Sequence, residues 1–409
     1  MKKRFIYILF LLLSIMISGC NNKTTTVEEN KSLWDFNTIS SIKPEVIDAY
    51  YYSGNSNIKG IWFKGAEYNN KATKIFAWVG FPKEEAPANG YPAVVLVHGG
   101  LGQPFADWVE LWNERGYVAI ALSVDSNYST ETGLKENNPD GGPNISFSTS
   151  DMFNTKNSWE YISVYNIMMC HNILRQYPNV DKENIGITGI SWGSFLTCAT
   201  VGVDSRFKFA IPVYGAGYNY LDISSNLASV FLQGDEFTDF YTNNLDPSVY
   251  LKNANLDMLW ITGINDPAFS IGCNQMASNL NKGTNRYSWR SMLVHGQEQG
   301  NGSQLPEIFD FADDVVNGTN KLFSVIEKSK EDDKIVLQID SSRTIQTIKC
   351  YYSSYPLEYW HDQSNVWESF EIQMVDGQIT INIPTEAVFL FVEVTDSAGY
   401  KMSSKMYSF

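Results

Sequence analysis

The stretch Gly189-Ile190-Ser191-Trp192-Gly193 decides the fold that we expect for this chain. Residues 184–190 before it are apolar and β-branched with only small interruptions, which is typical of a short buried strand. Residues 194–201 after it have the apolar spacing of a helix. A serine between two glycines at a strand-to-helix junction is a nucleophile elbow. The glycines are needed because a strained turn brings neighbouring chain too close for a Cβ atom.

Strands and helices alternate on both sides of this junction. Apolar runs that predict strands cover residues 93–97, 117–122, 207–214, 256–262 and 286–294. Helical spacing covers residues 105–115 and 157–177. This alternation predicts a doubly wound, mostly parallel sheet. Paired strands at residues 58–63 and 73–81 are expected to enter the same sheet.

A second glycine-rich turn, His98-Gly99-Gly100-Leu101-Gly102, follows the strand at 93–97. In α/β-hydrolases a turn of this kind supplies the first backbone donor of the oxyanion hole. We therefore expect the backbone N–H groups of Gly100 and Trp192 to stabilise a developing oxyanion. The alternative is an ordinary glycine-rich turn.

Acyl transfer by a serine also needs a base, and a carboxylate that holds the base in the right tautomer. In this fold the order along the chain is serine, acid and histidine, each after a strand. Asp266 and His295 satisfy that order and placement. The sequence therefore predicts a triad of Ser191, Asp266 and His295.

The choice of base is narrow because the chain has only four histidines. His98 belongs to the glycine-rich turn, His171 lies in a predicted helix, and His361 lies far towards the C-terminus. The rival acids are Glu298, close to His295, and Asp235 and Asp239, which fall in a segment at about 215–250 that we expect to form a cap.

Four blocks together resemble the acetyl xylan esterase-type hydrolases, which are similar to dienelactone hydrolases. The blocks are residues 98–100, 105–117, 187–193 and 204–215. The resemblance covers roughly residues 55–320 and implies an α/β-hydrolase catalytic domain. It also implies that Ser191 is the nucleophile, Asp266 the acid and His295 the base, with oxyanion donors at Gly100 and Trp192. Acylated polysaccharide or oligosaccharide is the substrate that the resemblance implies.

Two positions depart from the family pattern. Ser194 stands where relatives commonly have a second glycine, and Gln297 stands where a second histidine is common. Neither removes a member of the triad. Because we expect both to line the site, the resemblance does not fix the substrate preference.

The hydropathy pattern changes at residue 321 to a period of two. The alternating runs are residues 335–339, 347–352, 369–373, 378–383 and 388–394. Turn residues separate them, which predicts a small antiparallel β-sandwich domain at 321–409. Trp360 and Trp367 are interpreted as packing between its sheets, with sugar binding as the alternative. Since every predicted catalytic residue precedes residue 321, hydrolysis of small esters is expected not to need this domain.

The first 19 residues read as a lipoprotein signal peptide, with a basic start and an apolar run at 5–17. That run is shorter than the ~20 residues of a membrane span. Ile17-Ser18-Gly19-Cys20 resembles a lipobox, which implies acylation of Cys20 and a lipid anchor in the bacterial cell envelope. Residues 20–54 are expected to be a tether and N-terminal segment. The alternatives are an ordinary secreted protein and an uncleaved anchor.

Charge and cysteine content limit the partners. The net charge of −15 argues against binding to nucleic acid. It also indicates that any attachment to a membrane comes from lipid and not from a basic face. The widely spaced cysteines are interpreted as buried free thiols, with a disulfide left open. They are Cys170, Cys198, Cys273 and Cys350. There is no zinc pattern, and we expect no metal or cofactor.

Three functional hypotheses follow. The first is a serine hydrolase that deacetylates a polysaccharide such as xylan through an acyl-enzyme on Ser191. The second is a serine peptidase of the prolyl oligopeptidase type, in which a β-propeller normally precedes the hydrolase domain; the stretch before residue 58 is too short for one. The third is a non-catalytic surface protein that binds glycans.

Overall fold

The computed structural model describes residues 32–145, 154–222, 225, 227, 234–296, 302–355 and 367–409. Residues 32–409 form one compact unit. Cys20, Gln297, Glu298, Trp360 and His361 lie outside the described residues, so the expectations that concern them stay predictions.

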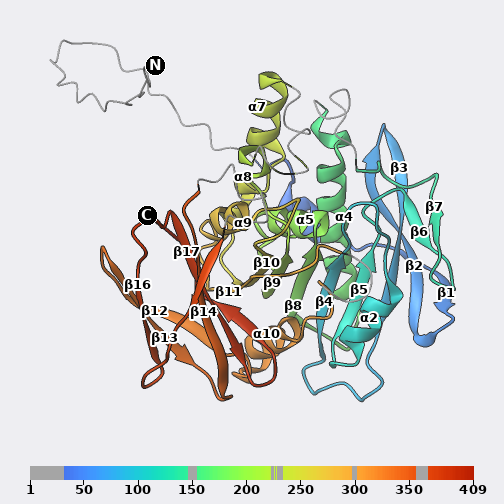
Figure 1. Ribbon diagram of the computed structural model, residues 1–409. Helices are drawn as coiled ribbons and strands as arrows, with labels where there is room; N and C mark the ends of the chain where they lie inside the picture. Colours follow the sequence, from blue (N-terminus) through green and yellow to red (C-terminus); the bar gives the residue numbers. More distant parts are fainter. Residues whose placement is uncertain are drawn as a thin grey trace, which may run out of the picture. The chain divides into compact units, whose positions relative to one another are not determined.

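The centre of this unit is a twisted, mostly parallel sheet (Figure 1). Its parallel strands, in spatial order, are β5 (Val118–Leu122), β4 (Tyr91–Val97), β8 (Val180–Ile190), β9 (Phe209–Val213), β10 (Asp257–Gly263) and β11 (Asn285–Arg290). At one end the sheet continues antiparallel through β3 (Lys71–Gly80), β2 (Asn55–Tyr68) and β1 (Val46–Tyr52). The predicted α/β-hydrolase sheet is thus confirmed.

Helices cover both faces of the sheet. They are α1 (Phe36–Ser41), α2 (Ala106–Asn113), α4 (Trp159–Leu174), α5 (Trp192–Val201), α7 (Asp235–Asn244), α8 (Ser248–Leu251), α9 (Ile271–Ser278) and α10 (Pro306–Asn317). Short 3₁₀ turns lie at η1 (Thr155–Asn157) and η2 (Asn219–Leu221). A small hairpin of β6 (Asn127–Ser129) and β7 (Lys135–Asn137) lies between β5 and η1, where the sequence analysis predicts no strand.

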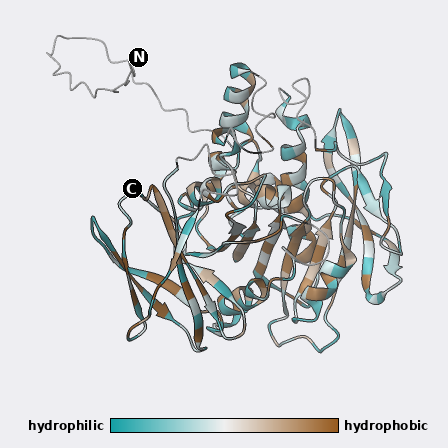
Figure 2. Cartoon of the chain, viewed as in Figure 1, coloured by the Kyte–Doolittle hydropathy of each residue, from teal (hydrophilic) through white to brown (hydrophobic). Residues whose placement is uncertain are grey.

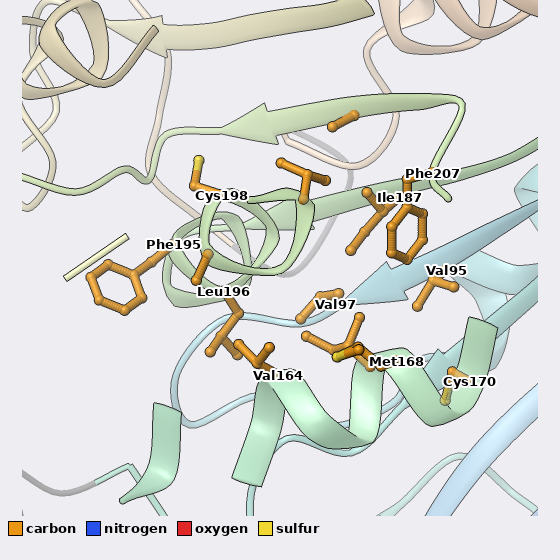
Figure 3. Close-up of a cluster of buried hydrophobic side chains, with 14 of the residues drawn as sticks. Val95, Val97, Val164, Met168, Cys170, Ile187, Phe195, Leu196, Cys198 and Phe207 are labelled. Carbon is orange, nitrogen blue, oxygen red and sulfur yellow. The ribbon is translucent and has the colours of Figure 1, made fainter. Parts of the chain in front are cut away.

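The apolar run of β4 is explained by its two buried faces. Val95 and Val97 pack in the core that also holds α4 and α5, while Val94 and Leu96 pack in a second core that holds α2 and α10. Figure 3 shows part of the first core, and Figure 2 shows the apolar character of the central strands. Successive side chains of a strand point to opposite faces of the sheet. Because both faces of β4 are buried, every residue of the run is apolar.

The N-terminal described residues belong to this fold and not to a tether. Trp34 is buried, and its indole Nε1–H donates to the carbonyl oxygen of Tyr161 in α4 (2.9 Å). β1 pairs with β2 along the edge of the sheet. The catalytic fold therefore begins before residue 55, the boundary that the sequence predicted, because the burial of single residues such as Trp34 leaves no periodic signal.

The C-terminal region forms two β-layers, as predicted. One layer is β12 (Ser324–Lys330), β13 (Lys334–Asp340) and β16 (Gln378–Asn382). The other contains β14 (Ile345–Ser353), β15 (Glu368–Glu371), β17 (Phe389–Asp396), β18 (Lys401–Ser403) and β19 (Tyr407–Ser408). Apolar side chains of both layers share one core, among them Ile335 and Leu337 on one side and Leu390 and Val392 on the other.

The second layer is continuous with the hydrolase sheet. β18 pairs antiparallel with β11, so that one 14-stranded sheet runs through both parts (Figure 1). An exposed β11 edge would present unpaired backbone groups, and β18 covers part of it. The structure thus argues against the expectation of an independent domain at 321–409, although the expected boundary does fall between α10 and β12.

The described cysteines are free and buried. None of the helices in the described residues is long and apolar enough to cross a membrane.

Candidate active site

Ser191 lies at the elbow between β8 and α5. Its backbone has φ 55° and ψ −123°, a left-handed conformation that L-residues rarely adopt. A Cβ on Gly193 would lie 2.0 Å from the carbonyl oxygen of Val97, and one on Gly189 would lie 2.2 Å from the carbonyl oxygen of Gly193. Neither position admits a side chain. Both glycines of the motif are therefore required by backbone contact, as the sequence predicted.

Ser191, His295 and Asp266 form a hydrogen-bonded chain. His295 Nε2 lies 2.8 Å from Ser191 Oγ, and His295 Nδ1 lies 2.7 Å from Asp266 Oδ2. Since an ionised carboxylate only accepts, Nδ1 carries the proton and Nε2 presents its lone pair to the serine hydroxyl. This is the tautomer that a general base for Ser191 needs.

The Asp266 carboxylate is buried and held on both oxygens. Oδ1 accepts from the backbone N–H groups of Ala268 (2.9 Å) and Phe269 (2.8 Å), which leaves Oδ2 directed at His295. The backbone N–H of Asp266 donates to the carbonyl oxygen of Gly263 (3.2 Å) at the end of β10. The turn after β10 thus fixes the position of the acid by contacts that do not involve the histidine.

The segment that carries His295 is anchored by groups that the sequence did not single out. The N–H of Leu293 donates to Asn265 Oδ1 (3.0 Å), and the N–H of Ser291 donates to Glu393 Oε2 in β17 (2.8 Å). Glu393 follows Ser291 by 102 positions, so no local pattern indicates this contact. The C-terminal layer therefore helps to hold the segment that bears the base.

Tyr214 packs directly against the base. Its ring centroid lies 4.5 Å from that of His295, and its hydroxyl donates to the carbonyl oxygen of Gly296. Burial raises the pKa of Tyr214, so the phenol stays protonated and remains a donor. Tyr214 has φ 37° and directly follows β9, at the sheet edge where the triad lies. The only sequence feature that could have indicated Tyr214 as a site residue is its position at the carboxyl end of a predicted strand.

The two predicted oxyanion positions lie side by side. A Cβ on Gly100 would approach Trp192 Cδ1 to 2.8 Å, and Trp192 is the first residue of α5. His98 in the same turn is buried and accepts at Nε2 from the N–H of Val124 (3.1 Å). Burial lowers the pKa of His98, so the imidazole stays neutral and ties the turn to the end of β5.

The other predicted candidates lie elsewhere. His171 is buried in α4 against Phe207, and burial lowers its pKa to about 3. Asp235 and Asp239 are exposed on α7.

Ser194 was expected to line the site, but it is fully buried, and its hydroxyl donates to the carbonyl oxygen of Gly215 (2.5 Å). Its hydroxyl therefore joins the turns after β8 and β9, which corrects that expectation. Within the described residues, no group of His, Cys, Asp or Glu is arranged to hold a metal ion.

Comparison with known proteins shows what this fold and geometry are similar to. Residues 34–228 match the family model described as acetyl xylan esterase (AXE1). The fold is that of an acetyl xylan esterase-type α/β-hydrolase. The matched range begins at Trp34, in agreement with the early start of the fold.

Two solved acetyl xylan esterases share this fold. That of a Paenibacillus species has a TM-score of 0.52 and 18% identity, over 64% of this chain and 87% of its own. Acetyl xylan esterase 1 of a Thermoanaerobacterium species has a TM-score of 0.53 and 16% identity, over 70% of this chain and 95% of its own. The likeness thus extends across most of both esterases.

Curated relatives include peptidases. The probable dipeptidyl-peptidase 5 of Aspergillus clavatus is 28% identical over 204 residues, which make up 47% of this chain and 25% of that protein. Dipeptidyl-peptidase 5 of Aspergillus oryzae is 24% identical over 217 residues, 50% of this chain and 25% of that protein. The chain thus spans about a quarter of the length of the curated relatives it matches.

Proposed function

We propose that the protein is a serine carboxylic ester hydrolase that removes acetyl groups from a polysaccharide such as xylan. The observation that carries the proposal is the hydrogen-bonded chain from Ser191 through His295 to Asp266, at the elbow of an acetyl xylan esterase fold. Within that fold, the arrangement meets the needs of acyl transfer without a cofactor.

In the proposed reaction, Ser191 Oγ attacks the acetyl carbonyl carbon while His295 Nε2 takes the hydroxyl proton. The backbone N–H groups of Gly100 and Trp192 stabilise the oxyanion, and Asp266 stabilises the imidazolium. The bond between the carbonyl carbon and the sugar oxygen then breaks, and His295 returns its proton to that oxygen. Water repeats the sequence on the acyl-enzyme, which releases acetate and restores Ser191.

A peptidase activity is the second candidate function, because the dipeptidyl-peptidases match about half of the chain. Ser191, His295 and Asp266 would serve that reaction equally well. The family match over residues 34–228 favours the esterase. Only the choice of substrate separates the two.

Mass spectrometry of acetylated xylo-oligosaccharides before and after treatment tests the proposal. We expect successive losses of acetyl units with the wild-type chain and none with Ser191→Ala. A dipeptide 4-nitroanilide serves as the competing substrate. Rapid cleavage of the anilide with no loss of acetyl would replace the esterase proposal with the peptidase.

We also propose that the protein is exported and anchored to the bacterial cell envelope by lipid on Cys20. The support is the signal-peptide pattern that ends in Ile17-Ser18-Gly19-Cys20. More than one acyl chain holds a protein on a membrane far better than a single chain does. Replacing Cys20 with Ser should therefore move the protein from the membrane fraction to the soluble fraction; retention of the variant in membranes would contradict the anchor.

A further inference from the structure

A polar cavity of about 480 Å³ lies beside the turn that carries Gly100. Its walls are Leu101, residues 125–127 after β5, residues 135–137 of β7, and Asn144 and Ile145. We propose that this cavity is a sugar subsite, which binds a neutral pyranose unit of the glycan while the ester is held at Ser191. The inference rests on the proposed function. It adds a location for the recognition of the sugar part of the substrate.

The position of the cavity follows from the sheet. β5, β4 and β8 are parallel neighbours in that order, so the residues after them lie at one edge of the sheet. Neighbouring strands are about 4.8 Å apart. The loop after β5 therefore lies about two strand spacings from Ser191, which follows β8, with the turn after β4 between them. Ligands of open α/β sheets bind at this edge.

The cavity wall and the Gly100 turn are hydrogen-bonded to each other. Lys135 Nζ donates to the carbonyl oxygen of Leu101 (2.6 Å), and Asn127 Nδ2 donates to the carbonyl oxygen of Gly102 (3.0 Å). From the same turn, His98 accepts from the N–H of Val124. A group held in the cavity is thus held at a fixed position relative to the proposed oxyanion donors.

Two polar groups in the wall have capacity left for a ligand. Asp125 is only 5% exposed; its Oδ1 accepts from the N–H of Ile145 (2.9 Å) and from the indole of Trp159 (3.1 Å). Its Oδ2 has no hydrogen bond to any described residue. Asn144 Oδ1 accepts from the N–H of Ser126 (2.9 Å), while its amide nitrogen has no partner among the described residues. A carboxylate oxygen and an amide N–H₂ that the protein leaves without a partner can accept from and donate to a ligand.

These groups match a sugar better than an acyl chain. Each sugar hydroxyl both donates and accepts, so it fits an unoccupied carboxylate oxygen beside an unoccupied amide N–H₂. Leu101 and Ile145 add apolar surface for the C–H face of the ring. The lining holds two carboxylates, Asp125 and Glu136, against one cation, Lys135, so an anionic ligand is disfavoured. A few directed polar groups that fix the orientation of the ligand are typical of small-ligand sites.

Two isosteric substitutions test the subsite in the full chain. Asp125→Asn keeps the Oδ1 acceptor for Ile145 and Trp159 but replaces Oδ2 with a donor. Asn144→Asp keeps the acceptor for Ser126 but removes the amide donor. The matched controls are Asp332→Asn and Asn253→Asp, which change exposed side chains outside the cavity. Melting temperatures establish that each variant is folded.

The readout is the ratio of kcat/KM for acetylated xylo-oligosaccharides to kcat/KM for 4-nitrophenyl acetate, which carries no sugar. Asp125→Asn should lower this ratio about tenfold or more, the usual effect of losing a hydrogen bond to a charged group, and Asn144→Asp, which changes a neutral, exposed side chain, should lower it about three- to tenfold. The controls should stay within about twofold of the wild type. A ratio within about twofold for both folded cavity variants would overturn the subsite. A selective loss on a dipeptide 4-nitroanilide, with the glycan ratio unchanged, would overturn it in favour of peptide binding.

A binding measurement separates this proposal from the proposed function. Calorimetry of xylotetraose with Ser191→Ala requires no turnover, and adding Asp125→Asn should weaken the Kd about tenfold. If the wild-type chain hydrolyses neither ester but this weakening is seen, the esterase proposal fails and the subsite stands. If both esters are hydrolysed but xylotetraose binds equally with and without Asp125→Asn, the subsite fails and the esterase stands.

Discussion

Ser191 combines a strained backbone with a hydroxyl that points at the base. The strain at φ 55° is held by glycines on both sides and by the Ser191 N–H, which donates to the carbonyl oxygen of Val213 (3.0 Å). Strain of this kind persists only where the surroundings fix it, and it is concentrated at functional sites. The elbow was predictable because its glycine spacing is a local signal, and the acid and the base were predictable because each follows a predicted strand in the chain order of this fold.

The triad should act as a unit. Ser191→Ala and His295→Ala should each lower kcat on 4-nitrophenyl acetate by about 10⁴–10⁶, and the double variant should lose little more. Asp266→Asn should lower kcat by a factor of roughly 10²–10⁴, because the imidazole remains but no carboxylate holds it in the right tautomer. Steady-state kinetics of the purified variants measures all four. A folded His295→Ala with wild-type turnover would rule out this mechanism.

Tyr214 is a positioning residue whose role the sequence did not reveal, because it depends on packing against a residue 81 positions away. Tyr214→Phe removes the hydroxyl that donates to Gly296 and keeps the ring. We expect kcat on 4-nitrophenyl acetate to fall about 3- to 30-fold, as the loss of one buried hydrogen bond would allow, with little change in KM. Tyr91→Phe is the matched control, because Tyr91 also donates to a backbone carbonyl, that of Glu84, at the opposite edge of the sheet. Equal effects of the two variants on kcat would refute the positioning role.

At the scale of elements, α4 carries an ionisable group in the core. Glu160 lies in the first turn of the helix, is buried, and has a pKa that desolvation raises to about 7. The folded state therefore binds a proton more tightly than the unfolded chain does. The stability that this proton contributes is present below the unfolded pKa and is lost as the pH rises through about 7.

Glu160→Gln should remove this dependence. At pH 8 the variant should be the more stable protein, by on the order of 3 kcal/mol from the size of the pKa shift, and the advantage should shrink towards pH 5. Thermal unfolding at both pH values measures it. Glu114→Gln, at an exposed position after α2, is the control and should show no such trend. A variant less stable than the wild type at pH 8 would contradict the assignment.

Element prediction was most accurate where periodic signals were long. The expected helix at 157–177 is observed as α4, Trp159–Leu174, with Ser158 accepting from the N–H of Tyr161 as its N-cap. The hairpin β6–β7 was missed because strands of three residues are too short to show a period of two. That hairpin supplies β7 to the proposed sugar subsite.

At the scale of the whole unit, the C-terminal β-layers are part of the hydrolase sheet. Besides the pairing of β18 with β11, the N–H of Met406 donates to Gln275 Oε1 of α9 (2.6 Å), and the N–H of Trp289 donates to Ser403 Oγ (2.9 Å). The sequence predicted two layers but not this union, because pairing between strands more than a hundred residues apart leaves no local pattern. The expected independence of the catalytic part therefore has little structural support.

Removal of residues 321–409 should be severely damaging. It exposes the β11 edge, and it leaves the N–H of Ser291, near the base, without Glu393. We expect a chain that ends at residue 320 to aggregate, or to lose most of its activity on 4-nitrophenyl acetate. Solubility, melting temperature and kcat of the truncated and full chains measure this. A soluble truncated chain with wild-type kcat would contradict the coupling.

The most direct test of the account is to locate the reactive nucleophile. A fluorophosphonate probe forms a stable adduct with a serine whose hydroxyl is activated by a base. Peptide mass spectrometry of the labelled full chain should find one adduct, on Ser191, and labelling should be lost in Ser191→Ala and greatly slowed in His295→Ala. An adduct on another serine, or undiminished labelling of Ser191→Ala, would contradict the assignment of Ser191 and the serine esterase built on it.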